Sequence, residues 1–288
     1  MSVEPGLEAP RPAEGDAFSD AVTFAFGDAE QRVCGLARLG IADGGVSGLA
    51  ILFHGSEPVA VRADSGAPAG GEGWDALSVA GITTTIDEPL RRWGISFDGG
   101  AEGGFELRFE ATGEPAEFDT GGMRSYEHLC RVSGEARVGD GTIAIDALGQ
   151  RGHAWGSPDW GEMTLARTVG AWLGDDLAVL MSAIRPDGAK EHGAEQLRAV
   201  VLEGAPAAPH VIEDPRLSTT YDAEGRQRRA GFELWADDES APARRGSGEV
   251  LCGTTIDLGR LRLDCAFYVW RMEGRVGVGR YDVLRRSE

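Results

Sequence analysis

The sequence predicts a protein built almost wholly from antiparallel β-strands, arranged in two similar halves. Three observations lead to this prediction: apolar and polar residues alternate in many segments, glycine and proline recur at the spacing of turns, and several short motifs appear twice in the same order. The 288 residues are enough for two domains of ordinary size. The 43 glycines disfavour long helices, because each glycine inside a helix costs roughly 1 kcal/mol relative to alanine.

Residues 1–20 are predicted to form a mobile arm. This stretch is rich in proline, glutamate, alanine and glycine and has little periodicity. Its acidic residues stand where a signal peptide would carry basic and then apolar residues, and the chain has no run of about 18 apolar residues. We therefore expect a cytoplasmic protein without stable membrane insertion.

The first half, residues 21–155, contains the clearest strand signals. Residues 105–110 alternate apolar with charged side chains, which is typical of a strand with one face in water. The same period runs through residues 132–145 on both sides of Gly139-Asp140-Gly141, where glycine can supply the positive φ that a short reversal needs. This segment predicts a hairpin.

The second half, residues 156–288, shows the same alternation. Residues 261–269 predict another long strand. Residues 163–184 could be scored as a helix, but glycines and the pair Asp175-Asp176 divide them into two pieces of strand length. We favour a hairpin there.

Repeated motifs support an internal duplication. The paired segments are 36–52 with 165–180, 127–130 with 249–252, and 141–146 with 259–264. Strands built from a restricted set of residues can echo one another by chance, but several echoes in the same order favour duplication. Two barrels or sandwiches packed together would provide a ligand cavity at their interface.

Charge and motif content exclude several functions. The net charge of −19 repels nucleic-acid phosphates and anionic membranes, so we expect no nucleic acid partner. The four cysteines lack the C-x-x-C spacing of a zinc site, and no metal is predicted. Dinucleotide-binding, P-loop, serine-hydrolase and zincin motifs do not occur, and we expect no cofactor.

Residues 149–162 concentrate the side chains that carry chemistry. They include a histidine, an arginine, two tryptophans and two carboxylates, and they directly follow a predicted strand. Side chains in such a position lie at the end of a sheet or at the mouth of a cavity, where a rigid scaffold often places functional groups.

This segment resembles the family of carotenoid 1,2-hydratases (hydroxyneurosporene synthases) and AttH-like proteins. The resemblance rests on Tyr126-Glu127, on the hairpin that ends at Asp146, and on the motif G-Q-R-x-H-x-W-G at 149–156 with Asp159-Trp160 beyond it. It implies two lipocalin-like β domains in tandem and an enzyme that hydrates, cyclises or closes rings in polyenes or terpenoids, although some members have no known activity. An acidic residue commonly lies between the Arg and the His of the motif, where this chain has Gly152.

The residues of this segment suit carbocation chemistry. Protonation of an alkene needs an acid kept neutral by apolar surroundings, and Asp159 and Glu162 are the nearest candidates, with His153 as a proton relay. Tryptophan faces stabilise a developing cation by roughly 2 kcal/mol when desolvated. Arg151 could orient a carboxylate or a polar end of the substrate, or could pair structurally with Asp159 or Glu127. The predicted substrate-binding residues are Trp155, Trp160, Trp172, Trp270, Arg151, Tyr126 and Glu127.

Most of these residues also have a purely structural interpretation. Trp155 and Trp160 could seal the ends of the sheets, and Asp159, after a proline, could cap a turn. His153 could be a buried, hydrogen-bonded histidine. A metal-binding role is disfavoured for it because no second histidine lies at ligand spacing.

The leading hypothesis is a cofactor-independent enzyme of the lyase or isomerase class, which holds a hydrophobic isoprenoid or polyene in a cavity between the two domains. The rival is a non-catalytic, lipocalin-like carrier of a hydrophobic small molecule, which needs the apolar cavity but no acid of perturbed pKa. A catalytically inert family member with an interaction role is the third hypothesis, and Gly152 favours it.

Overall fold

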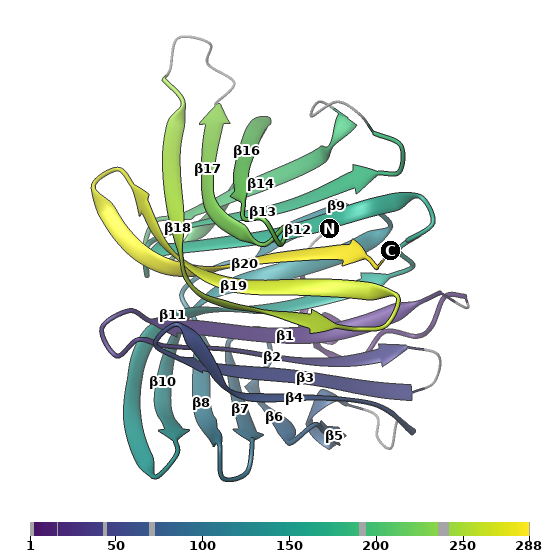
Figure 1. Cartoon of the computed structure of the whole chain (residues 1–288). Coiled ribbons are helices and arrows are strands. Elements are labelled where there is room, and N and C mark those ends of the chain that lie inside the picture. Colours follow the sequence, from purple (N-terminus) through teal and green to yellow (C-terminus); the bar gives the residue numbers. More distant parts are fainter. Residues whose placement is uncertain are drawn as a thin grey trace. The chain divides into compact units, whose positions relative to one another are not determined.

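The computed structural model describes residues 3–15, 17–42, 45–68, 73–189, 194–235 and 242–287, and within them nearly all regular structure is β-strand (Figure 1). The chain divides into two compact units, 1–158 and 159–288. Each unit contains a single, nearly closed antiparallel sheet, which confirms the predicted tandem of lipocalin-like β domains. In the described part of the chain, no helix has the length and apolar character needed to cross a membrane.

The first unit forms one curved sheet from eleven strands. Its order is β4-β3-β2-β1-β11-β10-β8-β7-β6-β5, with β9 paired to β10. The strands are β1 (Ser19–Asp28), β2 (Val33–Ala42), β3 (Gly45–His54), β4 (Glu57–Pro68), β5 (Ser78–Val79), β6 (Ile82–Glu88), β7 (Arg92–Asp98), β8 (Gly103–Ala111), β9 (Ala116–Thr120), β10 (Met123–Val138) and β11 (Gly141–Gly156). Two short 3-10 helices, η1 (Pro5–Glu8) and η2 (Trp74–Ala76), accompany the sheet.

Alternation along the strands places the core of the first unit. The predicted strand at 105–110 lies in β8, and the predicted hairpin is β10–β11, whose reversal begins at Gly139 with φ of +56°. On the inner face, Phe24 packs edge-on against Phe109 with ring centroids 5.2 Å apart. Both predictions of local structure are confirmed, because a period of two is enough to assign each strand its buried face.

The second unit repeats this topology with nine strands. Its order is β15-β14-β13-β12-β20-β19-β18-β17-β16. The strands are β12 (Met163–Gly174), β13 (Leu177–Pro186), β14 (Gln196–Glu203), β15 (Ala208–Ile212), β16 (Asp214–Tyr221), β17 (Gln227–Trp235), β18 (Arg244–Asp257), β19 (Leu261–Met272) and β20 (Arg275–Arg286). The predicted hairpin over 163–184 is β12–β13, and the strand predicted at 261–269 is β19.

The two sheets share a strand order, but the sequence echoes do not connect equivalent strands. In each unit the first strand pairs with the second and with the last, so β1 corresponds to β12, β2 to β13 and β10 to β19. The echo of 36–52 at 165–180 instead relates β2 to β12, and that of 127–130 at 249–252 relates β10 to β18. The duplicated architecture is therefore correct, whereas the particular motifs are displaced by one strand.

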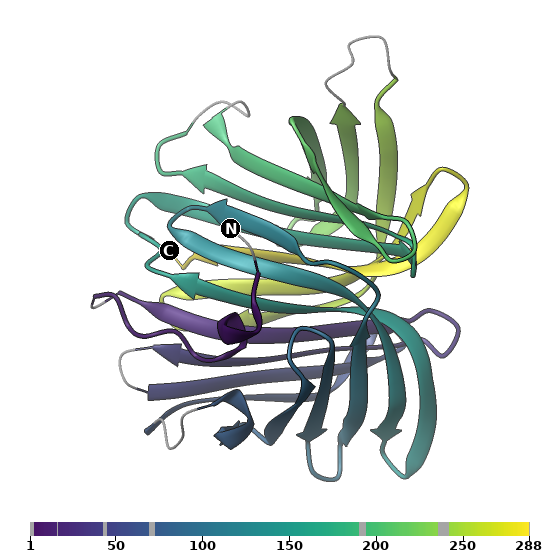
Figure 2. The ribbon, with the colours of Figure 1, turned by 180° about the vertical axis from the view of Figure 1, so that it is seen from behind.

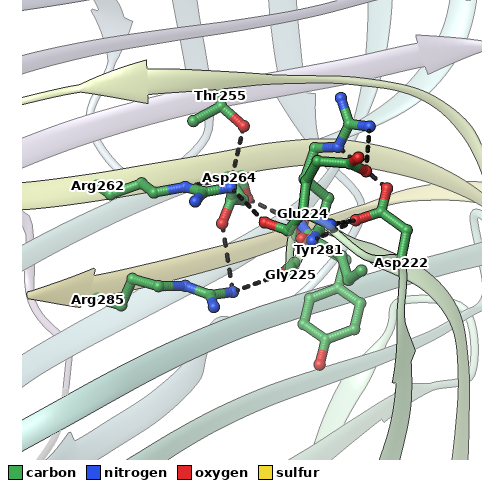
Figure 3. A network of polar contacts seen from close by, with 10 residues as sticks. Asp222, Glu224, Gly225, Thr255, Arg262, Asp264, Tyr281 and Arg285 are labelled. Carbon is green, nitrogen blue, oxygen red and sulfur yellow. Dashed lines mark hydrogen bonds and ion pairs between the residues drawn. The ribbon is translucent and has the colours of Figure 1, made fainter. Parts of the chain in front are cut away.

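A polar network in the second unit surrounds the buried carboxylate of Asp264 on β19 (Figure 3). Its Oδ1 accepts hydrogen bonds from Thr255 at 2.6 Å and from Arg262 at 2.9 Å, and Arg285 lies 3.2 Å from Oδ2. Both arginines also donate to main-chain carbonyls of residues 224–225, in the turn between β16 and β17. The network fixes that turn to β19 and β20.

The segment before β1 differs from the predicted mobile arm. Figure 2 shows it as a dark purple segment that contains the 3-10 helix η1 and belongs to no strand. Its residues nonetheless make buried contacts: Leu7 packs against the cluster of Phe18, Tyr126 and Trp155, and the side chain of Glu8 is buried. Strand β1 already begins at Ser19, inside the range assigned to the arm. Composition alone does not reveal these contacts.

Replacing Phe109 by alanine tests the assignment of the inner face. Phe109→Ala is expected to lower the free energy of unfolding by about 3–5 kcal/mol, because Phe109 is fully buried. Arg108→Ala, on the exposed face of the same strand, is expected to change it by less than about 0.5 kcal/mol. Urea unfolding followed by tryptophan fluorescence measures both, and equal effects would contradict the assignment.

Candidate functional site

Four polar side chains project from β10 and β11 into the interior of the first unit. The register places Tyr126 directly opposite His153 and His128 directly opposite Arg151. All four are buried and lie on the same face as the core residue Val132, because they follow its period of two along the hairpin. The predicted site residues Tyr126, Arg151 and His153 are thus brought together.

The N-terminal segment supplies a carboxylate to this group. Glu8, at the end of η1, is 3% exposed. Its Oε2 accepts hydrogen bonds from Arg151 Nη2 at 3.0 Å and from the indole nitrogen of Trp93 at 2.9 Å. Its Oε1 lies 3.0 Å from the hydroxyl of Tyr126, which donates to it. Three donors from three different strands therefore hold one carboxylate.

His153 lies between two hydrogen-bond acceptors. Its Nδ1 is 2.8 Å from the main-chain oxygen of Leu7, and its Nε2 is 2.7 Å from Oδ1 of Asp20 on β1. A carbonyl oxygen cannot donate, so Nδ1 carries a hydrogen. The short contact to Asp20 then requires a second proton, either on Nε2 or on the carboxyl.

Aromatic rings enclose these groups. The guanidinium of Arg151 lies 4.9 Å from the ring centroid of Trp93 and 5.3 Å from that of Tyr126. The imidazole of His153 meets Trp74 edge-on at 5.5 Å and Trp155 at 5.1 Å. The position of the guanidinium over the faces of Trp93 and Tyr126 favours its positive charge. We call the group Glu8, Asp20, Tyr126, His128, Arg151 and His153 with these three tryptophans the inner cluster.

The formal charges of the inner cluster form two ion pairs. Glu8 faces Arg151, and Asp20 faces His153. Burial raises the pKa of the Tyr126 hydroxyl against the opposing effect of Arg151, so this hydroxyl stays protonated at neutral pH. Burial, and secondarily the charge of Arg151, lowers the pKa of His128 to about 3, so His128 is neutral. The cluster thus contains a neutral imidazole beside compensated charges.

Gly152, which stands where the resembled family commonly has an acidic residue, lies on the other face of β11. Gly152 is opposite Glu127, and a Cβ atom at position 152 would lie 2.1 Å from Oε2 of Glu127. Gln150, also on this face, donates a hydrogen bond of 2.8 Å to the same oxygen. The Glu127 carboxylate thus fills the space in which a side chain at 152 would begin, and it does not belong to the inner cluster.

The two carboxylates predicted as catalytic acids lie outside the inner cluster. Asp159 and Glu162 are both exposed, in the turn that follows β11. Oδ1 of Asp159 accepts a hydrogen bond from the main-chain nitrogen of Gly161 at 2.8 Å, so this residue caps a turn. Strand β11 ends at Gly156, and the residues beyond it no longer follow the inward period. Trp160, in the same turn, is half-buried.

The remaining predicted tryptophans of the second unit lie on opposite faces of its sheet. Trp270 is part of the inner core, where its ring stacks on Tyr268 with centroids 5.3 Å apart. Trp172 is buried on the other face, beside Phe267. The alternation in β12 explains this, because Ala171 and Leu173 point into the core. The two tryptophans therefore do not line one pocket within this unit.

Several residues of the inner cluster were missed by the sequence analysis. Glu8 and Asp20 lie far from the 149–156 motif along the chain, in a segment without periodicity. Trp74 and Trp93 belong to η2 and β7, for which no motif was recognised. His128 could have been found, because counting back in steps of two from Val132 reaches it before Tyr126.

The described residues offer no grouped set of metal ligands. Among the residues that the structure describes, no three His, Cys, Asp or Glu side chains are grouped so that they could hold a metal ion. The four cysteines are buried, and none of them forms a disulfide.

Comparison with sequence families gives one identification. The model of DUF7064, a domain of unknown function, matches residues 5–286. The chain belongs to the DUF7064 family. No curated protein matches its sequence.

Solved structures with this fold include proteins of the kind that the motif resembles. An AttH-like protein from Nitrosomonas europaea has a TM-score of 0.68 and 12% identity, covering 92% of this chain and 91% of that chain. Kievitone hydratase from Nectria haematococca has a TM-score of 0.68 and 11% identity, covering 93% and 88%. CghA crystallised with Sch210972 has a TM-score of 0.66 and 10% identity, covering 94% and 89%. At these identities the likeness shows the fold.

The pH dependence of stability tests the burial of His128. Its pKa falls from an ordinary value of about 6.5 to about 3 in the folded protein, so the unfolded chain binds the proton more readily. The stabilisation is complete above about pH 6.5 and is lost as the pH falls toward 3. Between pH 7 and pH 5, the free energy of unfolding measured in urea should fall by about 2 kcal/mol more for wild type than for His128→Gln. An equal fall in the free energy of unfolding of both proteins would contradict the burial of His128.

A double-mutant cycle tests the contact between Gly152 and Glu127. Gly152→Ala is expected to lower the free energy of unfolding by about 1 kcal/mol, because the new methyl displaces the Glu127 carboxylate and its hydrogen bond from Gln150. In a Glu127→Ala background the same substitution should cost almost nothing. Thermal and urea unfolding of the four proteins measure the coupling, and additive effects would contradict the geometry.

Proposed function

We propose that this protein is a cofactor-independent enzyme of the lyase or isomerase class, which protonates an unsaturated bond in a hydrophobic isoprenoid or polyene. The proposal rests on one observation: within the first unit, among tryptophan rings, the buried imidazole of His153 lies between the Leu7 oxygen and the Asp20 carboxyl, a geometry in which the pair can hold a transferable proton. A proton held in such a place is available to a bound alkene and is shielded from bulk water.

The reaction would proceed by proton transfer from His153. The π electrons of the alkene take the proton, a new C–H bond forms, and the adjacent carbon becomes cationic. Asp20 remains as the carboxylate partner of a neutral imidazole. The cation then accepts water, closes a ring onto a second double bond, or loses a proton, and the proton released returns to the pair. No oxidant or reductant is consumed.

The surroundings of the pair suit a cationic intermediate. Trp74 and Trp155 both contact the imidazole with ring centroids within 5.5 Å. Their faces carry no nucleophile that would trap a carbocation, and they stabilise a desolvated positive charge by about 2 kcal/mol. The hydroxyl of Tyr126, kept protonated by its raised pKa, lies 3.4 Å from Nδ1 of His153. It is placed to orient a polar group or a water beside the acid.

The structural neighbours are compatible with this proposal. Kievitone hydratase is by name a hydratase, and the proposed protonation followed by water addition is one form of hydration. CghA was crystallised with a small molecule, Sch210972. Because these proteins are about one-tenth identical to this chain, they support the class of fold in which such a reaction is sought, and the residues are argued from the inner cluster alone.

Solvent deuterium incorporation tests the proposed acid. Linear prenyl and polyene compounds are incubated with the enzyme in D₂O, and products are analysed by mass spectrometry. We expect His153→Gln and Asp20→Asn to lower turnover by about 10²–10⁴-fold, as for loss of a general acid. Asp159→Asn and Glu162→Gln, in the exposed turn, should leave turnover unchanged.

Two outcomes would contradict the proposal. Loss of turnover in Glu127→Gln, with His153→Gln unaffected, would move the acid to the opposite face of β11. Tight binding of the compounds by a folded wild type, without product or deuterium, would favour the carrier function. Circular dichroism and thermal unfolding of each variant separate loss of chemistry from loss of folding.

A further inference from the structure

The carboxylate of Glu8 occupies a site that the sheet builds without it. Its three donors come from separate strands of the first unit: Trp93 from β7, Tyr126 from β10 and Arg151 from β11. All three are fully buried, and the rings of Trp93 and Tyr126 contact the guanidinium. Neighbouring strands fix their positions through main-chain hydrogen bonds, so the donor set is part of the rigid scaffold.

The acceptor comes from a different kind of element. Glu8 ends a 3-10 helix of four residues, and no strand pairing joins the described residues 3–15 to the sheet. The segment is held by the side-chain hydrogen bonds of Glu8, by those that the Leu7 oxygen accepts, and by the packing of Leu7. The main-chain N–H of Arg11 also donates to Oδ2 of Asp20 at 2.6 Å, and its guanidinium lies over the ring of Trp155. Release of the segment breaks side-chain contacts and no strand ladder, whereas removal of any donor would disrupt a strand. The carboxylate is the exchangeable partner.

Arg151 has donors that Glu8 does not use. Its Nη2 binds Glu8, while its Nε and Nη1 are buried without a hydrogen-bond partner among the described residues. Two parallel N–H groups of a guanidinium match the two oxygens of a carboxylate, and such a bidentate pair is stronger than the single contact seen with Glu8. A carboxylate free to choose its orientation can therefore bind Arg151 better than Glu8 does.

Leu7 and Glu8 together cover both the donors of the carboxylate site and His153, the proposed acid. While Glu8 occupies the carboxylate site, the main-chain oxygen of Leu7 accepts the hydrogen bond from Nδ1 of His153. Tyr126 bridges the two positions, 3.0 Å from Oε1 of Glu8 and 3.4 Å from Nδ1 of His153. Departure of Leu7 and Glu8 would free the carboxylate site and the N–H of His153 together.

We propose that the substrate carries a carboxylate, which binds Arg151, Trp93 and Tyr126 in place of Glu8. This inference rests on the proposed function and names the substrate class of that site: a hydrophobic, unsaturated carboxylic acid. Because Tyr126 adjoins both the carboxylate site and His153, the reacting double bond lies within a few bonds of the carboxylate. Glu8 holds the site closed until such an acid displaces it, and displacement uncovers the proton donor.

Binding measurements with a matched pair of probes test this inference. The probes are farnesoic acid and farnesol, which share an isoprenoid chain and differ in the carboxylate. By calorimetry, Glu8→Gln is expected to bind the acid at least 10-fold more tightly than wild type, because the competing carboxylate is gone. The affinity for farnesol should change less than 3-fold. In Arg151→Met the preference for the acid should disappear.

Hydrogen exchange on the wild-type protein provides a second test that needs no substitution. Addition of farnesoic acid should increase amide exchange in residues 4–9, because the segment leaves, while farnesol should not. Unchanged exchange with saturating acid, or equal affinity of wild type and Glu8→Gln for the acid, would overturn the inference.

The two proposals fail in distinguishable ways. If the acid displaces the segment but no deuterium enters a product, the carboxylate site stands and the enzymatic proposal fails. If turnover depends on His153 but neutral and acidic substrates react equally in wild type and in Arg151→Met, the enzymatic proposal stands and the carboxylate site fails.

Discussion

The pairing of β10 with β11 is the constraint on which the inner cluster depends. The two strands are each 16 residues long, and their register sets Tyr126 opposite His153 and His128 opposite Arg151. Side chains alternate between faces, so a slip of one strand by one residue would turn its two members of the group away from the interior. The register is fixed by the short reversal at Gly139, more than ten residues from the site along each strand. The turn at Gly139 thus determines which side chains lie opposite one another at the far end of the hairpin.

This dependence explains which parts of the protein could be predicted. Strands β8, β10, β11 and β19 were recognisable because apolar and polar residues alternate with a period of two within short stretches of sequence. The same rule places Arg151, His153 and Trp155 on one face of β11, and the motif did identify them as a group. It fails at Gly156, where the strand ends, and Asp159 and Glu162 therefore belong to an exposed turn although they are neighbours in sequence.

The acids of the inner cluster could not be predicted, for a related reason. Glu8 reaches Arg151 across 143 residues, and Asp20 reaches His153 across 133. No local period links such pairs, and the composition of residues 1–20 resembles that of an unstructured arm. The prediction of an internal duplication was limited in a similar way. The strand order that the two units share is a property of each whole sheet. The repeated motifs reflect only a common strand pattern, and they fall on strands that are not equivalent.

The composition of the inner cluster argues for a function beyond stability. A buried ion pair contributes little net free energy, because removing two charges from water costs about as much as their attraction returns, and apolar residues of similar volume are often as stable. The first unit nevertheless buries two such pairs, Glu8–Arg151 and Asp20–His153, and leaves Nε and Nη1 of Arg151 without a described partner. A core selected for stability alone would have no use for these spare donors. A site that exchanges one carboxylate for another needs them.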